Sequence, residues 1–234
     1  MSASVVLSLV VLLTGATAPA AAPGGQDRAA SGARTEQPRD LRPPPRVPVD
    51  FRGYVHFDEV WMSASRSFKA VVGTSSLTAG GVGVDVIDLW RQVFVRAGFS
   101  RMGGYGSRVF VEDAEVVPLN VPFAVRVRAL ELGAGWRFGH PKLPRYTFYG
   151  GAGFVRLGFT ERSAFARDED SDEAFRGRTV FGGVEIPVWK RLVAGGEIQF
   201  RSVPNALGDG GVSAAFQETG LGGFMIRGLV AIRK

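Results

Sequence analysis

Residues able to carry out acid–base or nucleophilic chemistry are few and scattered in this chain. Cysteine is absent, which excludes a disulfide framework, a thiolate metal site and a cysteine nucleophile. Of the two histidines, His140 lies in a proline-rich stretch and His56 in a segment of alternating polarity. A serine nucleophile needs a base within hydrogen-bond reach, and no His-x-Ser motif is present. The sequence therefore predicts no enzymatic activity and no cofactor.

Acidic residues gather in one run, DEDSDE at 168–173. Its alternating acids begin like an EF-hand calcium loop, but Glu173 stands where that loop requires glycine and Thr179 where it requires glutamate. We therefore expect a solvated loop and no metal site. The net charge is +6, yet Lys and Arg do not alternate with aromatic residues as in a nucleic-acid groove, so no nucleic-acid partner is predicted.

Three regions follow one another along the chain. An apolar run of nine residues at 5–13 is too short to span a bilayer and precedes small residues at 16–22, which predicts a signal peptide over 1–22. The alternative is a frayed apolar N-terminus. Residues 23–50 are rich in Pro, Gly, Ala and Arg and predict a disordered linker. The remaining residues, 51–234, form the folded domain.

That domain contains eight segments of alternating polarity, each long enough to be a strand of a membrane barrel. They cover residues 53–62, 77–87, 92–100, 124–138, 146–160, 178–188, 192–203 and 219–232. Short turns at 88–91, 139–145 and 189–191 alternate with long loops at 63–76, 101–122, 161–177 and 204–217. This pattern predicts an all-β fold, an eight-stranded antiparallel up-and-down β-barrel without a long helix.

In the segments after the first, one face is apolar and the other carries glycine with isolated charges. The predicted lumen charges are Asp85, Arg96, Glu131, Arg137, Arg156, Glu185, Glu197, Arg201 and Arg227. Alternation alone leaves open which face is inside, because a soluble barrel of lipocalin type would turn its apolar face inward. Both signs of charge on glycine-rich faces favour a narrow polar interior, where buried charges need partners. The phase of the first segment also stays open, since His56 and Asp58 indicate one face and Glu59 the other.

Aromatic residues lie at the ends of the segments. Trp90, Trp136 and Trp189 flank the short turns, and Phe99, Phe159 and Phe200 lie near the long loops. Amphipathic Trp rings at one rim and further aromatic residues at the other are typical of the two interfaces of a membrane barrel. The alternative is a set of surface aromatics on a soluble barrel.

On this pattern, residues 51–234 resemble the small bacterial outer-membrane β-barrel family of the OmpA/OmpX type. The resemblance implies a transmembrane barrel with short periplasmic turns, long extracellular loops and both barrel termini on the periplasmic side. It also implies a monomer in contact with outer-membrane lipid or lipopolysaccharide, inserted by the outer-membrane assembly machinery. One departure is the end of the chain, Arg233-Lys234, where the family usually carries an aromatic residue on the lipid-facing phase.

The resulting hypothesis is an integral outer-membrane protein with a charge-filled lumen and a structural or surface-interaction role. A narrow pore is one alternative, and a secreted soluble lipocalin-like ligand-binding barrel is another. For the acidic run at 168–173, weak divalent-cation bridging to lipopolysaccharide phosphates is the alternative to a solvated loop.

Overall fold

The computed structural model describes residues 50–90, 92–112, 115–163, 171–208 and 211–233. The predicted signal peptide, and the predicted linker up to residue 49, lie outside the described residues. So do residues 168–170 of the acidic run, whose remaining residues open a strand.

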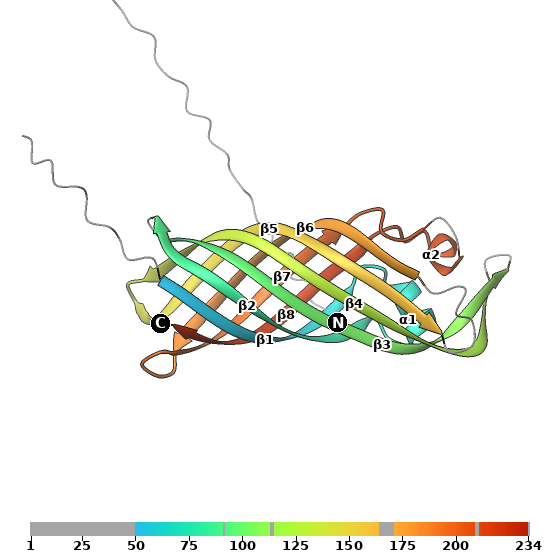
Figure 1. Ribbon diagram of the computed structural model, residues 1–234, viewed down its shortest axis with the longest axis horizontal. Helices are drawn as coiled ribbons and strands as arrows, with labels where there is room; N and C mark the ends of the chain where they lie inside the picture. The colour runs from blue at the N-terminus through green and yellow to red at the C-terminus, as the bar shows by residue number, and fades with distance from the viewer. Residues whose placement is uncertain (1–49, 91, 113–114, 164–170, 209–210, 234) are drawn as a thin grey trace, which may run out of the picture. The chain divides into compact units, whose positions relative to one another are not determined.

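Eight antiparallel strands close into one barrel, in which each strand pairs with its neighbours in sequence and the last pairs with the first (Figure 1). The strands are β1 (Asp50–Met62), β2 (Ser76–Trp90), β3 (Val93–Glu112), β4 (Glu115–His140), β5 (Leu143–Ser163), β6 (Ser171–Pro187), β7 (Leu192–Val203) and β8 (Leu221–Arg233). All eight predicted strands are present, and the predicted up-and-down topology is confirmed.

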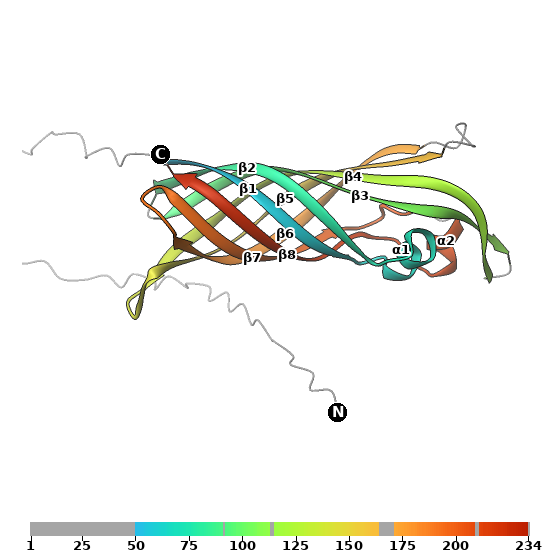
Figure 2. The ribbon, with the colours of Figure 1, turned by 90° about the horizontal axis from the view of Figure 1, so that it is seen from below.

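The two ends of the barrel differ, as the loop lengths predict. One end, here the turn end, carries the short connections after β2, β4 and β6 together with the start of β1 and the end of β8. The other, the loop end, carries two short helices, α1 (Ser65–Val72) and α2 (Gly211–Ala215). Figure 2 shows both helices beside the long ends of β3 and β4.

The prediction of a loop at 101–122 is wrong, because these residues belong to β3 and β4 or to the connection between them. β3 and β4 continue as a paired hairpin to Glu112 and Glu115, well past the predicted strand ends. Two prolines lie in this stretch, and the ladder shifts register opposite them, between Ser107, which pairs with Pro122, and Val109, which pairs with Pro118. A bulge is a place where a strand tolerates proline, because a ladder hydrogen bond is already missing there.

The register fixes the width of the barrel. A path of directly paired residues that starts at Arg52 on β1 returns to β1 at Met62, ten residues further along. The path runs through Asp85, Arg96, Gly133, Gly153, Thr179, Arg201 and Gly223. This stagger tilts the strands, and an eight-stranded barrel has an interior just wide enough for side chains to fill.

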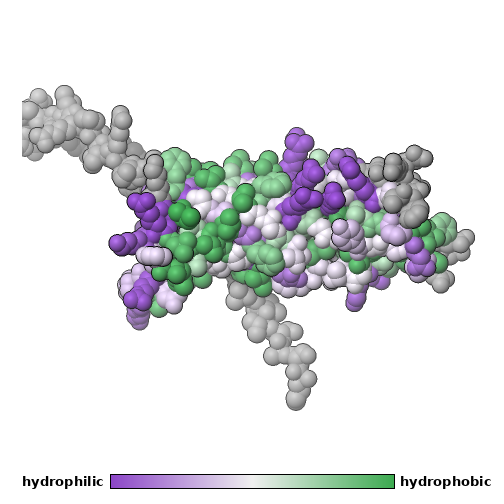
Figure 3. Space-filling view, turned by 60° about the horizontal axis from the view of Figure 1, so that its bottom comes forward, coloured by the Kyte–Doolittle hydropathy of each residue, from purple (hydrophilic) through white to green (hydrophobic). Residues whose placement is uncertain are grey.

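The apolar face of the barrel points outward. On β7, for example, Ile198 is 56% exposed whereas its neighbour Glu197 is 2% exposed. Figure 3 shows the outward apolar residues as a green belt between the turn end and a group of hydrophilic side chains. This arrangement is the reverse of the soluble lipocalin-like alternative. It also settles the phase of β1, because His56 and Asp58 lie inside.

β5 has the opposite phase to the one expected from its sequence, which corrects two predicted site residues. Tyr149, Val155 and Leu157 point into the barrel, so Arg156 is exposed on the outer wall and is not a lumen charge. Phe159 packs against the interior cluster and is not an interface aromatic. The prediction failed because both faces of this strand are rich in glycine and apolar residues, so one arginine decided the phase.

The interior consists of two layers. The half toward the turn end holds the charged residues together with a few aromatic rings. Toward the loop end, an apolar cluster fills the barrel and includes Met62, Met102, Leu157 and Met225. Phe68 of α1 belongs to this cluster, so the helix caps the apolar layer. Both layers are side chains, as the narrow interior predicts.

Candidate functional sites: the charged lumen and the loop-end cavity

The charged layer contains five arginines and five carboxylates among the described residues. The carboxylates are Asp58, Asp85, Glu131, Glu185 and Glu197, and the arginines are Arg52, Arg96, Arg137, Arg201 and Arg227. All of the predicted lumen charges except Arg156 are therefore inside. Arg52 and Asp58 were not among them, because both lie on β1, whose phase the sequence left open. With them, the two signs balance.

These ten side chains form one connected network. Its ion pairs follow one another in the order Arg137–Glu185–Arg52–Asp85–Arg96–Glu197–Arg227, after which Arg227 contacts both Asp58 and Glu131, and Glu131 also binds Arg201. Arg137 donates to Glu185 at 2.9 Å and Arg96 Nε to Asp85 at 2.9 Å. Every buried carboxylate in the network thus has a charged partner, as a buried charge requires.

The strand register places the partners next to each other. Asp85 on β2 lies directly opposite Arg52 on β1 and directly opposite Arg96 on β3. Arg52 and Arg96 donate to different oxygens of the same carboxylate. The alternation of the strands therefore predicts that these side chains point inward, and the pairing determines which of them meet.

The guanidinium of Arg96 lies among four aromatic rings. Its central carbon is 4.9 Å from the ring centre of Phe181, and 5.1, 5.3 and 5.5 Å from those of Tyr54, Tyr149 and Phe94. A flat cation close to aromatic rings is stabilised by their electron-rich faces. These rings together with the arginine fill the cross-section of the barrel near the turn end.

Glycines make room for the rings. A Cβ atom at Gly83 would lie 2.2 Å from the Tyr54 ring, and one at Gly183 would lie 2.5 Å from the Tyr149 ring. Inward-facing glycines are thus required wherever a neighbouring strand lays an aromatic side chain across them. This explains the glycine-rich inner faces that the sequence shows.

The boundary between the charged and apolar layers is also filled. A small gap there, lined by residues that include Val60, Met102, Leu157 and Arg201, is too small to hold a water molecule. The side chains of both layers are packed across the lumen. A continuous water path through the described part of the barrel would require these side chains to move.

Aromatic residues lie on the outer wall near both ends. At the turn end, Trp90 and Trp136 meet edge to face at 6.4 Å between ring centres, and Trp189 is 74% exposed. Phe99 and Phe200 are exposed toward the loop end. The predicted interface aromatics other than Phe159 therefore lie on the outer face.

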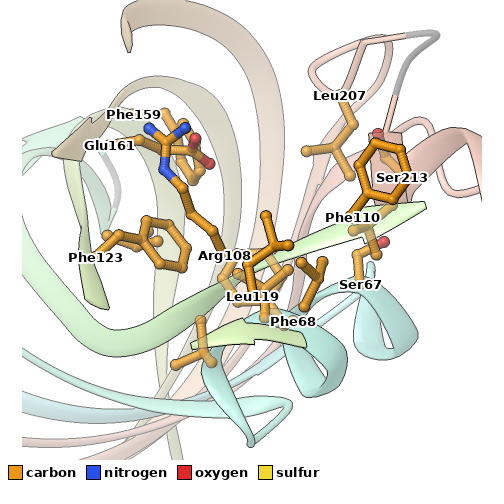
Figure 4. A pocket seen from close by; sticks show the side chains of 15 residues that line it. Ser67, Phe68, Arg108, Phe110, Leu119, Phe123, Phe159, Glu161, Leu207 and Ser213 are labelled. Carbon is orange, nitrogen blue, oxygen red and sulfur yellow. The ribbon is translucent and has the colours of Figure 1, made fainter. Parts of the chain in front are cut away.

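A cavity of about 480 Å³ opens at the loop end (Figure 4). Its lining comes from α1, from the extended ends of β3, β4 and β5, and from the segment after β7. The lining is mainly apolar and includes Phe68, Phe110, Phe123, Phe159 and Leu207. This site was not predicted from the sequence, because two of its walls lie in the stretch expected to be a loop.

Two charged side chains, Arg108 and Glu161, point into the cavity (Figure 4). Burial raises the pKa of Glu161 above its ordinary value, and Glu173 raises it further, against the opposing effect of Arg108. The cavity therefore combines a mainly apolar lining with a few polar side chains, a combination common in small-molecule sites.

The helix above this cavity is held by a residue from another loop. α1 has no side-chain cap of its own, and Glu218 instead accepts hydrogen bonds from the backbone N–H groups of Arg66 at 3.1 Å and Ser67 at 2.8 Å. The central carbon of the Arg66 guanidinium also lies 4.7 Å from the ring centre of Phe216. The connection between β7 and β8 therefore fixes the position of the β1–β2 connection.

Among the described residues, no helix is long and apolar enough to cross a membrane. The same residues contain no group of three or more His, Cys, Asp or Glu side chains arranged to hold a metal ion.

Comparison with protein-family models and with curated proteins gives no match. Among solved structures, Neisserial surface protein A matches with a TM-score of 0.53 and 10% sequence identity, covering 78% of this chain and 96% of that chain. The N-terminal β-barrel domain of Pseudomonas aeruginosa OprF has a TM-score of 0.48 at 11% identity, covering 79% of this chain and 97% of that one. The attachment invasion locus protein Ail of Yersinia pestis has a TM-score of 0.47 at 9% sequence identity, covering 80% of this chain and 100% of that one. This chain has the fold of the small eight-stranded outer-membrane β-barrels.

Proposed function

We propose that the protein is an integral outer-membrane β-barrel that does not conduct and has no enzymatic activity. The observation that carries this proposal is the inverted polarity of the barrel, with an apolar belt outside and ten balanced charges inside. Such an outer surface would be costly in water and is favourable in lipid, where only a closed barrel or a helix satisfies the backbone. The protein acts as a membrane scaffold for the surface at its loop end.

The proposed orientation follows from the ends of the barrel. The turn end, with the first and last strand termini, faces the periplasm, and the loop end faces the cell exterior. Each strand is paired on both edges, so no strand edge is left for pairing with a second copy, which supports a monomer. The assembly machinery that inserts it would meet Phe224, Ile226, Val230 and Ile232 on the outer face of β8.

The lumen argues against a pore and against catalysis. Arginines and carboxylates are paired across it, and the apolar layer lies above them. His56 contacts Asp58 at 2.8 Å inside this network and lies on the inner wall below the apolar layer, away from the loop-end cavity. A substrate would therefore have to displace packed side chains to reach it.

The proposal is tested on the full chain refolded into lipid vesicles. We expect unboiled protein to migrate differently from boiled protein on a denaturing gel, together with a β-type circular dichroism spectrum. In planar bilayers, we expect no single-channel steps. Identical mobility without β structure would overturn the membrane placement, and a steady open-channel conductance would overturn the closed lumen.

The loop-end cavity supports a second function, the binding of a small apolar molecule. Its volume of about 480 Å³ lies within the range of ligand pockets, about 300–1,000 Å³. The folded protein in amphipol is titrated with 1-N-phenylnaphthylamine, which brightens in apolar sites. We expect saturable brightening that Leu119→Trp, which fills the cavity, abolishes. The control Val117→Trp, two residues away and outside the lining, is expected to preserve it, and equal loss in both variants would contradict this function.

A further inference from the structure

Six arginines cover one side of the outer wall. They are Arg101 on β3, Arg126 and Arg128 on β4, Arg156 on β5, and Arg176 and Arg178 on β6. All six are exposed and point away from the lumen. We call this set the arginine cluster. Its four strands are consecutive in the barrel, so the cluster is one continuous surface.

The strand register brings these like charges together. Arg101 lies directly opposite Arg128, and Arg156 lies directly opposite Arg176. Like charges at directly opposed positions of a sheet are destabilising. Among the described residues, none of the six forms an ion pair with a carboxylate. The cluster therefore concentrates positive charge on this part of the outer wall.

The cluster begins where the apolar belt ends. Phe99 and Leu130 are opposed in the belt, and the next outward pair toward the loop end is Arg101 with Arg128. On the neighbouring strands, Phe154, which is 70% exposed, lies opposite Arg178. In Figure 3 hydrophilic side chains gather on the wall between the green belt and the loop end. In a membrane, this level is that of the lipid headgroups.

Every member of the cluster is an arginine, and the described part of β3 to β6 carries no lysine on its outer wall at this level. The planar guanidinium offers two parallel N–H donors that match the oxygens of a phosphate, and it retains its charge at any physiological pH. Its long apolar stem can lie along the belt while the charged end reaches the interface. The chemistry of the cluster therefore fits phosphate.

We propose that the arginine cluster binds the phosphate groups of a lipid that carries more than one phosphate, in the leaflet at the loop end. The proposal rests on the membrane placement proposed above. Arginines on four adjacent strands engage several phosphates at once, while the acyl chains of the lipid lie along the belt below them. The position on the side wall, and not on the loop tips, favours a lipid over a sulfated polysaccharide.

The test measures lipid binding by native mass spectrometry of the folded protein released from detergent micelles. The probes are diphosphoryl lipid A and phosphatidylethanolamine, with inorganic phosphate and heparin as competitors. The cluster variant is Arg101→Gln, Arg128→Gln, Arg156→Gln and Arg176→Gln combined. A second variant carries Lys at the same four positions. The matched control removes four charges at the turn end, by Lys142→Gln, Arg145→Gln, Lys190→Gln and Arg191→Gln.

We expect the wild type and the turn-end control to retain diphosphoryl lipid A, and the Gln variant to bind it about tenfold more weakly or worse, because several charge-assisted hydrogen bonds are lost together. The Lys variant should bind diphosphoryl lipid A with an affinity between those of the wild type and the Gln variant, since lysine keeps the charge but lacks the planar guanidinium. Inorganic phosphate at millimolar concentration should compete poorly.

Equal binding by the wild type and the Gln variant would overturn the proposal. So would full displacement by inorganic phosphate, or cluster-dependent binding of heparin that exceeds the binding of the lipid. Gel mobility before and after boiling confirms that each variant is folded. A wild type that fails to insert into vesicles refutes the membrane placement itself, an outcome separate from loss of lipid preference.

Discussion

Arg227 on β8 and Asp58 on β1 lie directly opposite each other and join through two hydrogen bonds of 2.8 and 3.1 Å. They are 169 residues apart in the sequence, and their pairing crosses the seam where the last strand meets the first. The same guanidinium also contacts Glu197 and Glu131. Arg227 therefore joins the ion pairs that end at Glu197 to Asp58, and through Glu131 to Arg201, at the seam where the barrel closes.

Removal of the carboxylate at this seam should destabilise the fold strongly. We expect Asp58→Ala to lower the free energy of unfolding by about 3 kcal/mol, because it leaves part of a buried charge without its partner. Urea unfolding in lipid vesicles, followed by tryptophan fluorescence, measures this change. The control is Glu59→Gln on the outer face of the same strand, expected within about 0.5 kcal/mol of wild type. Similar losses for both variants would show that the seam pair has no special role.

Arg96 should not be replaceable by lysine. It contacts Asp85 and Glu197 while lying among four rings, and one ammonium group cannot make all of these contacts. We expect Arg96→Lys to lower the free energy of unfolding by about 2 kcal/mol. Arg137→Lys is the comparison, because Arg137 is 13% exposed and contacts Glu185 alone, and its expected loss is below about 1 kcal/mol. Equal losses of unfolding free energy in the two variants would show that the four rings around Arg96 do not matter for this difference.

The inward glycines should be sensitive to a single methyl group. A Cβ at Gly83 would overlap the Tyr54 ring, so we expect Gly83→Ala to destabilise the barrel by about 1–3 kcal/mol. Gly196→Ala, where no heavy atom lies within 4 Å of the added Cβ, should be nearly neutral. In a double-mutant cycle, Tyr54→Leu combined with Gly83→Ala should cost less than the sum of the two single changes. Strict additivity would show that the ring and the glycine are not coupled.

Much of the fold follows from the sequence because a barrel strand repeats every two residues. The alternation of polar and apolar residues predicted the eight strands and the lumen charges on β2, β3, β4, β6, β7 and β8. The alternation of short and long connections predicted the order of the strands. A strand with one clearly charged face, such as β7 with Glu197, Gln199 and Arg201, leaves no choice of phase. On such strands, pattern and packing agree.

The remaining features depend on packing that alternation does not describe. Arg156 lies on a strand whose two faces are similarly apolar, and only its neighbours decide which face is buried. The apolar inner layer at the loop end reverses the rule that polar residues point inward, which is why Leu157 and Phe159 misled the assignment. The cavity and the contact of Glu218 with α1 join segments far apart in the sequence and have no local signal.

Acid should release α1 from the barrel. Burial alone would raise the pKa of Glu218, but the hydrogen bonds from the backbone N–H groups of Ser67 and Arg66 lower it below its ordinary value. A carboxylate with a lowered pKa stabilises the folded form above its unfolded pKa, near 4.3, and this stabilisation is lost as the pH falls through the lowered value. A spin label at Lys69→Cys should therefore become mobile only below about pH 4.

Glu218→Gln supplies the control for this pH dependence. With an uncharged amide in place of the carboxylate, the mobility of the label should no longer change with pH in the acid range. A label that becomes mobile at the same acid pH in both backgrounds would show that another group controls the attachment of α1.

The most direct test of the membrane account is the environment of the outward apolar side chains. The chain has no cysteine, so single cysteines can be introduced without other changes at Ile198, Phe200, Ile226 and Val230 in the belt and at Lys69 and Lys190 outside it. Spin labels at these positions in vesicle-inserted protein are exposed to oxygen, which partitions into lipid, and to a water-soluble nickel chelate. We expect high oxygen and low nickel accessibility at the four belt positions, and the reverse at Lys69 and Lys190. Belt labels as accessible to nickel as the label at Lys190 would contradict the membrane placement.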